Sequence, residues 1–254
     1  MSYFTSLVQN EWMKITSKRQ LPYYLIFLFV VLAAAIGLQL WSQSEGGSEV
    51  GSVGFTSFIF GITSVFTGIF SIVIASQIIT DEFKDGTIKQ LLIRPASRTM
   101  ILMSKLVTII LVVLFVNLAM LLVTALAAFI LFDSSAGGIN VLWEGTILPF
   151  FLTLPNELFY ILVAFTAAVL TRSLGLSISI AVILNSLAGM LSIFIAEKPW
   201  YKYTVFPHLN WKSYYMGQPP IEGVTFGFTF GIFTLYMLAL LLISIWVFKK
   251  RDIQ

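Results

Sequence analysis

Long apolar runs dominate the pattern of hydrophobic and polar positions along the chain. Each run could cross about 30 Å of hydrocarbon as a helix of roughly 20 residues. Strands of a membrane barrel would instead be short segments that alternate between apolar and polar positions. The pattern predicts an all-α membrane protein with six transmembrane helices, at Pro22–Trp41, Phe55–Ile79, Ile101–Phe132, Thr146–Thr171, Leu174–Ala196 and Thr225–Phe248.

Three segments follow from these spans: residues 1–21, a transmembrane domain over 22–248, and a tail over 249–254. In the first segment apolar residues recur near helical spacing, with polar residues between them. This pattern predicts a helix that lies along the lipid headgroups, and a plain membrane anchor is its simplest role. The apolar positions are Phe4, Leu7, Val8, Trp12 and Ile15, and the polar ones are Asn10, Glu11, Lys14 and Lys18.

Composition agrees with a membrane protein and excludes several chemistries. Of 254 residues, 58% are hydrophobic and only 11% are charged, whereas soluble domains carry about 25% charged residues. The net charge of +3 does not favour nucleic-acid binding. Because the chain has no cysteine and a single histidine, His208, thiolate chemistry and a multi-histidine metal site within one chain are excluded.

The basic residues are sorted to one side of the predicted membrane. With the N-terminus inside, twelve of the fifteen Lys and Arg residues fall in inner segments. The three outer ones are Lys198, Lys202 and Lys212. Because Lys and Arg accumulate in cytoplasmic loops, this predicts a multi-pass plasma-membrane protein with both termini in the cytoplasm.

The inner segment Thr80–Met100 has an amphipathic pattern of its own. It predicts a short helix that Asp81 and Glu82 begin, where acidic residues suit the helix dipole. Arg94-Pro95 would end that helix, and Ser97 would cap the next span. Two interpretations remain open: a helix resting on the inner leaflet, or a docking helix for a soluble partner. The apolar periodicity is carried by Phe83, Thr87 and Leu91, and by Ile88 and Leu92.

Aromatic residues crowd the last outer segment, residues 197–224. Trp and Tyr prefer the membrane interface, which predicts short interfacial or re-entrant helices broken at Pro207 and at Pro219-Pro220. The segment is either an aromatic belt or part of an outer gate, with Phe206 as a gate residue.

Polar positions within the spans provide candidates for a substrate pathway. Small residues recur every three or four positions in the second span, which suits close helix packing or, alternatively, hydroxyls that line a passage. Glu157 is the single ionisable residue predicted within the hydrocarbon, and it follows a kink expected at Pro155. Its carboxylate either contacts a substrate or proton, or lies in an outer vestibule, with Asn117 and Asn185 as possible partners. The pathway candidates are Glu157, Asn156, Asn117, Asn185, Ser57, Ser64, Ser71 and Phe206.

Motifs for nucleotide binding and hydrolysis are missing from the chain. There is no G-x-x-x-x-G-K-[ST], no H-E-x-x-H and no G-x-S-x-G. The chain therefore looks like a passage that is not catalytic by itself and needs an energising partner.

The sequence of the inner loop resembles that of a known family. The run D-E-F-K-D-G-T-I-K-Q-L-L-I-R-P-A-S-R, with S-K at 104–105, resembles the signature of ABC transporter permeases of the type-2 export class. E-W-M-K-I at 11–15 is similar to that family's elbow helix, and F-P-H-L-N at 206–210 is similar to its stretch before the last span.

The resemblance implies an ATP-driven exporter. Two permease chains, identical or different, would pair in the membrane above two ATP-binding ABC subunits, which bind the ATP and magnesium. The loop would be the coupling helix, and the substrate would be hydrophobic or amphipathic, as in Gram-positive bacitracin-type, lantibiotic-immunity or phenol-soluble-modulin peptide exporters. The coupling residues so implied are Asp81, Glu82, Phe83, Asp85, Gly86, Thr87, Ile88, Leu91 and Leu92.

Two other functions remain compatible with the residues. The chain could be a membrane scaffold or sensor that recruits a cytoplasmic partner through residues 80–100. It could also be a membrane-embedded enzyme that acts on lipid, with Glu157 as its acid or base.

Overall fold

A computed structural model describes residues 3–46, 51–86, 96–131, 143 and 147–250. All regular elements in these residues are helices. The long ones are α1 (Tyr3–Ser17), α2 (Gln20–Ser44), α3 (Ser52–Lys84), α5 (Arg98–Leu131), α7 (Leu148–Thr171), α8 (Leu174–Ile195) and α10 (Phe226–Lys250). Short helices η2 (Tyr201–Tyr203), η3 (Phe206–His208) and α9 (Trp211–Tyr215) lie between α8 and α10.

Five of these helices are long and apolar enough to cross a membrane: α2, α3, α5, α7 and α10. This confirms the all-α membrane class for the described residues. The described part of α8 that meets the apolar criterion, Leu174–Met190, counts as a shorter apolar helix. The sixth span therefore stays a prediction.

The chain divides into two units, and several helices contribute residues to both. Unit 1 comprises Met1–Val8, Ser71–Ile109 and Leu152–Gln254, and unit 2 comprises Gln9–Phe70 and Ile110–Phe151.

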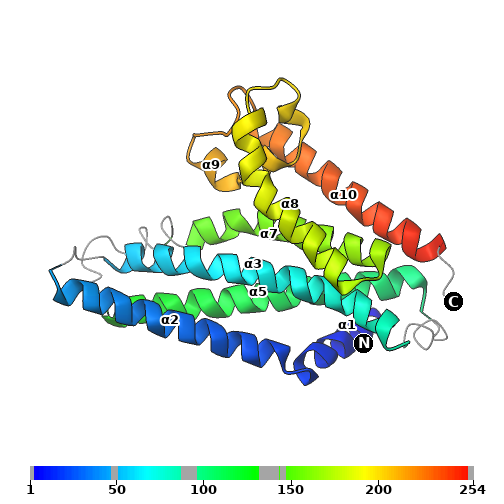
Figure 1. Ribbon diagram of the computed structural model, residues 1–254, viewed down its shortest axis with the longest axis horizontal. Coiled ribbons are helices and arrows are strands. Elements are labelled where there is room, and N and C mark those ends of the chain that lie inside the picture. Colours follow the sequence, from blue (N-terminus) through cyan, green and yellow to red (C-terminus); the bar gives the residue numbers. More distant parts are fainter. Residues whose placement is uncertain (1–2, 47–50, 87–95, 132–142, 144–146, 251–254) are drawn as a thin grey trace. The chain divides into compact units, whose positions relative to one another are not determined.

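Unit 2 is held by apolar and aromatic contacts among α2, α3 and α5, which run side by side (Figure 1). The rings of Tyr24 and Phe70 stack at 3.7 Å between centroids. The Tyr24 hydroxyl donates a hydrogen bond of 3.1 Å to Thr67 Oγ1, so this phenol is satisfied within an apolar layer. Further along α2 and α3, Leu32, Ala35, Phe55 and Ile59 form a buried cluster that Val123 of α5 covers.

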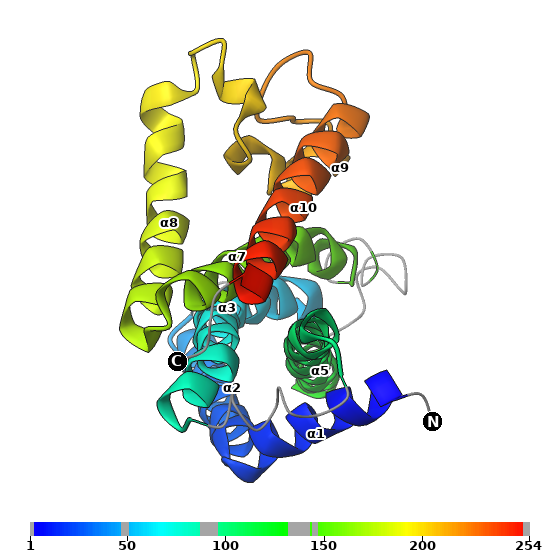
Figure 2. The ribbon, with the colours of Figure 1, turned by 90° about the vertical axis from the view of Figure 1, so that its right-hand side faces the viewer.

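Unit 1 contains α8, α10 and the C-terminal part of α7. Figure 2 shows α8 and α10 leading to the same segment, which carries η2, η3 and α9. Side-chain hydrogen bonds fasten α10 to α7: Ser244 Oγ donates to Thr166 Oγ1 at 2.9 Å, and Thr166 Oγ1 donates to Leu240 O at 3.4 Å. Hydroxyls can make such interhelical bonds where no water competes.

Helix boundaries confirm some expectations and correct others. Ser97 caps α5, because its Oγ accepts from Met100 N at 3.2 Å. The expectation that Asp81 and Glu82 begin a separate loop helix is wrong, since both lie in the last turns of α3, which continues to Lys84. Just beyond the helix, Gly86 has a φ of +68°, a left-handed value that glycine adopts without strain. The predicted helix beyond it falls on residues 87–95, outside the described residues.

The turn between α7 and α8 is as short as expected. α7 ends at Thr171 and α8 begins at Leu174. Arg172 takes a φ of +54°, and the Ser173 hydroxyl accepts from Leu176 N at 3.5 Å as a weak cap. Pro155 lies inside α7, which continues through it.

Two residues sit differently from what their sequence context predicted. Pro207 does not break a helix but lies in the first turn of η3, where its missing N–H costs nothing. Glu11, expected on the polar side of the N-terminal helix, is buried at 4% exposure together with Leu7 and Ile15. Lys14 Nζ pairs with the Glu11 carboxylate at 3.2 Å, which explains how a charge is tolerated on the buried side.

Candidate functional site

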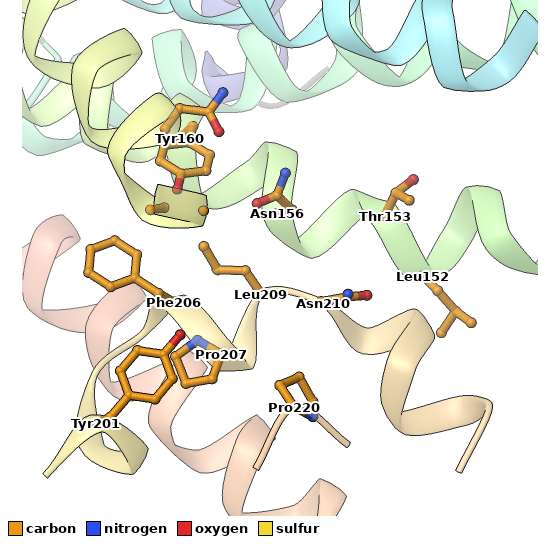
Figure 3. A pocket seen from close by; sticks show the side chains of 13 residues that line it. Leu152, Thr153, Asn156, Tyr160, Tyr201, Phe206, Pro207, Leu209, Asn210 and Pro220 are labelled. Carbon is orange, nitrogen blue, oxygen red and sulfur yellow. The ribbon is translucent and has the colours of Figure 1, made fainter. Parts of the chain in front are cut away.

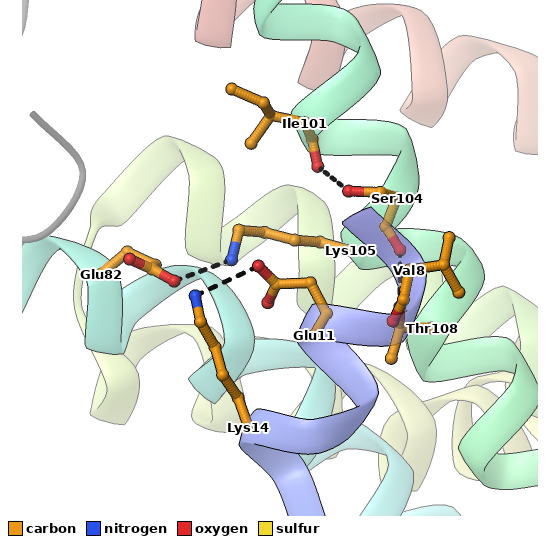
Figure 4. Close-up of polar contacts among 8 residues, drawn as sticks. All are labelled: Val8, Glu11, Lys14, Glu82, Ile101, Ser104, Lys105 and Thr108. Carbon is orange, nitrogen blue, oxygen red and sulfur yellow. Dashed lines mark hydrogen bonds and ion pairs between the residues drawn. The ribbon is translucent and has the colours of Figure 1, made fainter. Parts of the chain in front are cut away.

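A buried ion pair joins the two helices that flank the inner loop. Lys105 Nζ of α5 lies 3.0 Å from Glu82 Oε1 of α3, and the two side chains are 1% and 8% exposed (Figure 4). Lys105 is among the largest fully buried side chains in the described residues. Burying two charges is favourable only when they meet with good geometry, so this contact fixes the end of α3 against the start of α5.

A second cation lies beside the same turn of α3. The guanidinium carbon of Arg172, in the α7–α8 turn, lies 4.6 Å from the ring centroid of Phe83. This is a favourable cation–π distance. Glu82, Phe83, Lys105 and Arg172 are named the ion-pair cluster here. It connects three elements: the end of α3, the start of α5 and the α7–α8 turn.

Two further contacts converge on the start of α5. Arg98 donates from Nη1 to Lys249 O near the end of α10 at 3.0 Å, a position where a cation suits the helix dipole. Thr108 Oγ1 donates to Val8 O of α1 at 3.4 Å and to Ser104 O at 2.8 Å (Figure 4). The segment next to the predicted coupling loop is thus tied to α1 and α10 as well.

The predicted coupling residues divide between these helices and undescribed positions. Asp81, Glu82 and Phe83 lie in α3, and Asp85 N bonds to Asp81 O at 2.8 Å as the helix ends. The carboxylate of Glu82 is directed to Lys105 inside the protein rather than to an outer surface. Thr87, Ile88, Leu91 and Leu92 lie outside the described residues.

Glu157 finds a partner that the sequence did not single out for it. Ser71 Oγ of α3 donates to Glu157 Oε1 of α7 at 2.8 Å. Ser71 is fully buried, and Glu157 is half-buried. A hydrogen bond to a charged acceptor is stronger than one between neutral groups, so Ser71 stabilises the carboxylate at this depth. Of the partners expected, Asn117 belongs to unit 2 and Asn185 lies elsewhere in unit 1.

The single histidine organises the aromatic segment, residues 197–224. His208 is fully buried; its Nε2 lies 2.8 Å from Lys202 O, and its Nδ1 lies 3.0 Å from Thr229 Oγ1 of α10. A carbonyl can only accept, so Nε2 carries the proton and Nδ1 accepts from the hydroxyl. The main-chain oxygen of His208 also accepts from Trp211 Nε1 at 3.0 Å.

Burial keeps this imidazole neutral. It lowers the pKa of His208 below its ordinary value of 6.5, while the hydrogen bond to the Lys202 carbonyl acts in the opposite direction. The sequence predicts no individual role for His208, which enters there only in excluding a metal site and as part of F-P-H-L-N. Its place in F-P-H-L-N, between aromatic residues, was the available signal of a structural centre.

A pocket of about 460 Å³ lies in unit 1 against the aromatic segment (Figure 3). It is named the amide pocket, because three asparagine side chains share its lining. Asn156 comes from α7, Asn185 from α8, and Asn210 precedes α9. The remaining lining residues are Leu152, Thr153, Tyr160, Ala188, Gly189, Tyr201, Phe206, Pro207, Leu209 and Pro220.

The pocket brings together three of the predicted pathway residues, Asn156, Asn185 and Phe206. Asn185 lines the same pocket as Tyr160 of α7, and each lies about 16 Å along its helix from the α7–α8 turn at a rise of 1.5 Å per residue. Tyr160, Tyr201 and Asn210 were missed, since nothing in the local pattern separates them from ordinary interfacial residues.

Other pathway candidates do not line this pocket. Ser57 and Ser64 belong to unit 2, where Ser57 is exposed and the Ser64 hydroxyl donates to Gly61 O of its own helix at 2.9 Å. Such a bond satisfies a hydroxyl inside an apolar helix without any ligand. Among the described residues, no group of three or more His, Cys, Asp or Glu side chains could hold a metal ion.

Comparisons with known proteins identify relatives. The family described as "Protein of unknown function (DUF2705)" matches residues 40–254. The chain is 31% identical over 205 residues to "Uncharacterized protein YhcI" of Bacillus subtilis (strain 168), covering 75% of this chain and 66% of that relative, slightly less than two thirds of its length. It is 27% identical over 226 residues to "Uncharacterized membrane protein YdbK" of the same strain, covering 83% of this chain and 87% of that protein. Together with the five apolar helices, these matches indicate a multi-pass membrane protein.

Proposed function

The chain belongs to the DUF2705 family, and we propose that it is the membrane-spanning permease subunit of an ATP-driven exporter. In this proposal α8 is the sixth span, α1 is an interfacial elbow helix, and residues 87–95 carry the coupling helix. Both termini lie in the cytoplasm. A second permease chain completes the membrane part, and two ABC subunits bind the ATP and magnesium and perform the hydrolysis.

The buried Glu82–Lys105 pair is the observation that carries this proposal. Glu82 ends the helix before the inner loop, and Lys105 lies near the start of the helix after it, so a displacement of the loop would move both helix ends together. A loop that only rests on the lipid surface would not need a desolvated ion pair at its base, which is costly to bury. A loop that transmits force from a soluble partner would benefit from one.

The contacts of Arg172 and Arg98 extend the same argument. Arg172 links α3 to the α7–α8 turn, and Arg98 links α5 to the end of α10. A movement of the loop would therefore reach α7, α8 and α10, which include helices that line the amide pocket. These contacts connect the loop that would bind the ATPase with the helices around a possible substrate site.

Co-purification and ATP hydrolysis test the proposal. The chain is captured through an affinity tag from the membranes of its own cells, any co-purifying ATPase is identified by its Walker motif, and the complex is reconstituted in lipid nanodiscs. We expect the ATPase to be retained and its hydrolysis to be stimulated by the permease. A permease that retains no ATPase would contradict the proposal, and retention without any change in hydrolysis would favour a recruiting scaffold.

A pair of variants at one position isolates the loop. Gly86→Asn keeps a residue that tolerates the left-handed backbone, whereas Gly86→Trp adds bulk at the base of the docking surface. We expect Gly86→Trp to abolish stimulated hydrolysis and Gly86→Asn to retain most of it. Gly37→Trp on α2, where an added side chain also meets open space, is the control for bulk alone.

A further inference from the structure

The lining of the amide pocket, as far as the described residues form it, carries no charge. Among these residues no Asp, Glu, Lys, Arg or His side chain lines the pocket, although three carboxamides and two phenols do. A charged group placed there would lose part of its hydration without meeting a counter-charge among these residues, which costs more than burying a neutral group. The chemistry of the lining therefore selects an uncharged ligand.

The hydroxyl group of Tyr160 has no hydrogen-bond partner among the described residues. Its side chain is only 3% exposed, yet within the described residues its hydroxyl makes no hydrogen bond and lines the pocket. The Tyr160 oxygen is not among the fully buried polar atoms without a partner, so it is open to the pocket and available to a ligand. Asn156 and Asn185 are exposed, and their carboxamides make no hydrogen bond in the described part of the chain. Three polar groups thus converge on one space without satisfying one another.

The wall opposite these groups is held in place before any ligand arrives. Phe206, Pro207, Leu209 and Asn210 line the pocket, while His208 between them faces the other way, to Thr229 and to the Lys202 carbonyl. Figure 3 shows Tyr160 and Asn156 on α7 across the pocket from Phe206, Pro207 and Leu209. A preformed wall lowers the ordering cost of binding.

A peptide group matches what the pocket offers. Carboxamides and phenols each both donate and accept, and a peptide group presents one donor and one acceptor side by side. Phe206, Pro207 and Pro220 supply flat apolar surface next to these groups, which suits neighbouring apolar side chains. The volume lies at the lower end of the range of roughly 300–1,000 Å³ for ligand pockets, enough for a short segment rather than a folded domain.

We propose that the amide pocket binds the main chain of an uncharged, apolar peptide segment. The peptide-binding proposal rests on the proposed function in one respect: the bound segment is taken to be part of the exported substrate. Tyr160, Asn156 and Asn185 make the hydrogen bonds, and the proline and aromatic residues of the aromatic segment contact the apolar side chains.

Direct binding to the permease alone tests the proposal. The full chain is reconstituted in phosphatidylcholine nanodiscs without ATPase, and saturable binding of radiolabelled trileucine, N-acetylated and C-amidated, is measured against an excess of unlabelled peptide. We expect Tyr160→Phe and Asn185→Leu each to weaken binding roughly three- to tenfold, the loss of one hydrogen bond. Tyr236→Phe is the matched control, because its hydroxyl donates to Tyr203 O and does not line the pocket.

Two competitors define the ligand class. Trileucine with free, charged termini should compete at least about tenfold more weakly than the capped peptide, since charge burial is disfavoured. Dodecyl maltoside, an uncharged polyol on an alkyl chain, should not displace the capped peptide. Equal displacement by the maltoside would assign the pocket to a glycosyl headgroup and overturn the proposal. Binding that is absent, or unchanged in both Tyr160→Phe and Asn185→Leu, would overturn it too.

The design separates this proposal from the proposed function. Asn185 is exposed on α8, so Asn185→Leu stays informative if Tyr160→Phe fails to fold. A chain that binds the capped peptide but retains no ATPase keeps the peptide site and loses the exporter role. A chain that retains the ATPase but binds no peptide keeps the exporter role and loses the peptide site.

Discussion

The ion-pair cluster and the amide pocket both belong to unit 1, and each is formed by residues of several elements. They differ in their charge and in their hydrogen bonding. The cluster buries two opposite charges against each other, as the 3.0 Å contact of Glu82 with Lys105 shows. The pocket has no charged side chain among the described residues that line it, and Tyr160, Asn156 and Asn185 make no hydrogen bond within that part of the chain. A satisfied buried pair resists separation, whereas unsatisfied neutral groups await a ligand. The difference is the basis on which we propose a mechanical role for the first region and a binding role for the second.

Breaking the ion pair on one side should have the largest effect. Lys105→Met leaves the Glu82 carboxylate buried without its partner, and such a change costs about 3–5 kcal/mol of stability. The double variant Glu82→Leu with Lys105→Met should recover most of that loss, because it removes both charges. Thermal unfolding in detergent and a double-mutant cycle measure this, with Lys198→Met, an exposed lysine, as the control. Equal stability of the single and double variants would refute mechanical coupling through the pair.

Measuring stimulated ATP hydrolysis in the double variant tests whether the ion pair and the pocket have separate roles. If the pair transmits movement, the double variant should be folded but poorly stimulated in complex with the ATPase, while its capped-peptide binding stays near that of the wild type. Normal stimulation in the double variant would reduce the pair to a structural contact. Loss of peptide binding would show that the two regions are not separable.

Removing the histidine should have the next largest effect and act on the pocket wall. His208→Phe fills the buried site but leaves the Lys202 carbonyl and the Thr229 hydroxyl without their ring partners. We expect a loss of about 2 kcal/mol, within the range for buried groups left unpaired. Tryptophan fluorescence of the aromatic segment and affinity for the capped peptide report the change. An unaltered affinity would contradict the role of His208 in holding the wall.

Removing the hydroxyl beside Glu157 should have a smaller effect. Ser71→Ala deletes a donor to the carboxylate and should cost about 1 kcal/mol, since hydrogen bonds to charged groups contribute somewhat more than neutral ones. Ser64→Ala is the matched control, because that hydroxyl bonds only within its own helix in the contact described. Both variants are compared by unfolding temperature, and equal temperatures would show that Ser71 does not stabilise Glu157.

Acidification should produce the mildest change. Burial lowers the pKa of His208 below 6.5, so the unfolded chain takes up its proton first as the pH falls. Stability of the aromatic segment is therefore constant above pH 6.5 and decreases as the pH falls from 6.5 toward the lowered pKa. The loss is limited because Thr229 Oγ1 and the Tyr214 hydroxyl, 3.4 Å from Nδ1, can both rotate to accept. His208→Gln should remove this dependence, and tryptophan fluorescence between pH 8 and pH 5 measures it.

Local features of the sequence predicted the helices well. The apolar runs, the Ser97 cap and the two-residue turn at Arg172–Ser173 all follow from interactions within a few residues. The errors arose where a distant contact competed with a local signal. Asp81 and Glu82 suit the start of a helix by charge, but Lys105 stabilises Glu82 at the end of α3 instead. Glu11 suits a polar surface, yet it is buried beside Lys14.

The candidate sites show the same division. Glu157, Asn156 and Asn185 could be selected because polar groups within apolar spans are costly and therefore informative, and Phe206 because of its place in the aromatic segment. Tyr160 could not, since a tyrosine in a span is ordinary until its neighbours are known. The hydrogen-bond partner of Glu157 is Ser71, a residue predicted as a pathway candidate but not as the partner of this carboxylate.

Amino-acid order alone was enough to establish a charge-poor, all-helical membrane protein and to locate its irregular segments, because hydrophobicity and helix capping are short-range properties. Packing established which residues meet. The pairing of Glu82 with Lys105 spans 23 positions and that of Ser71 with Glu157 spans 86, so neither follows from any local pattern. The amide pocket likewise exists only because α7 and α8 present matching depths to a wall that His208 holds from behind.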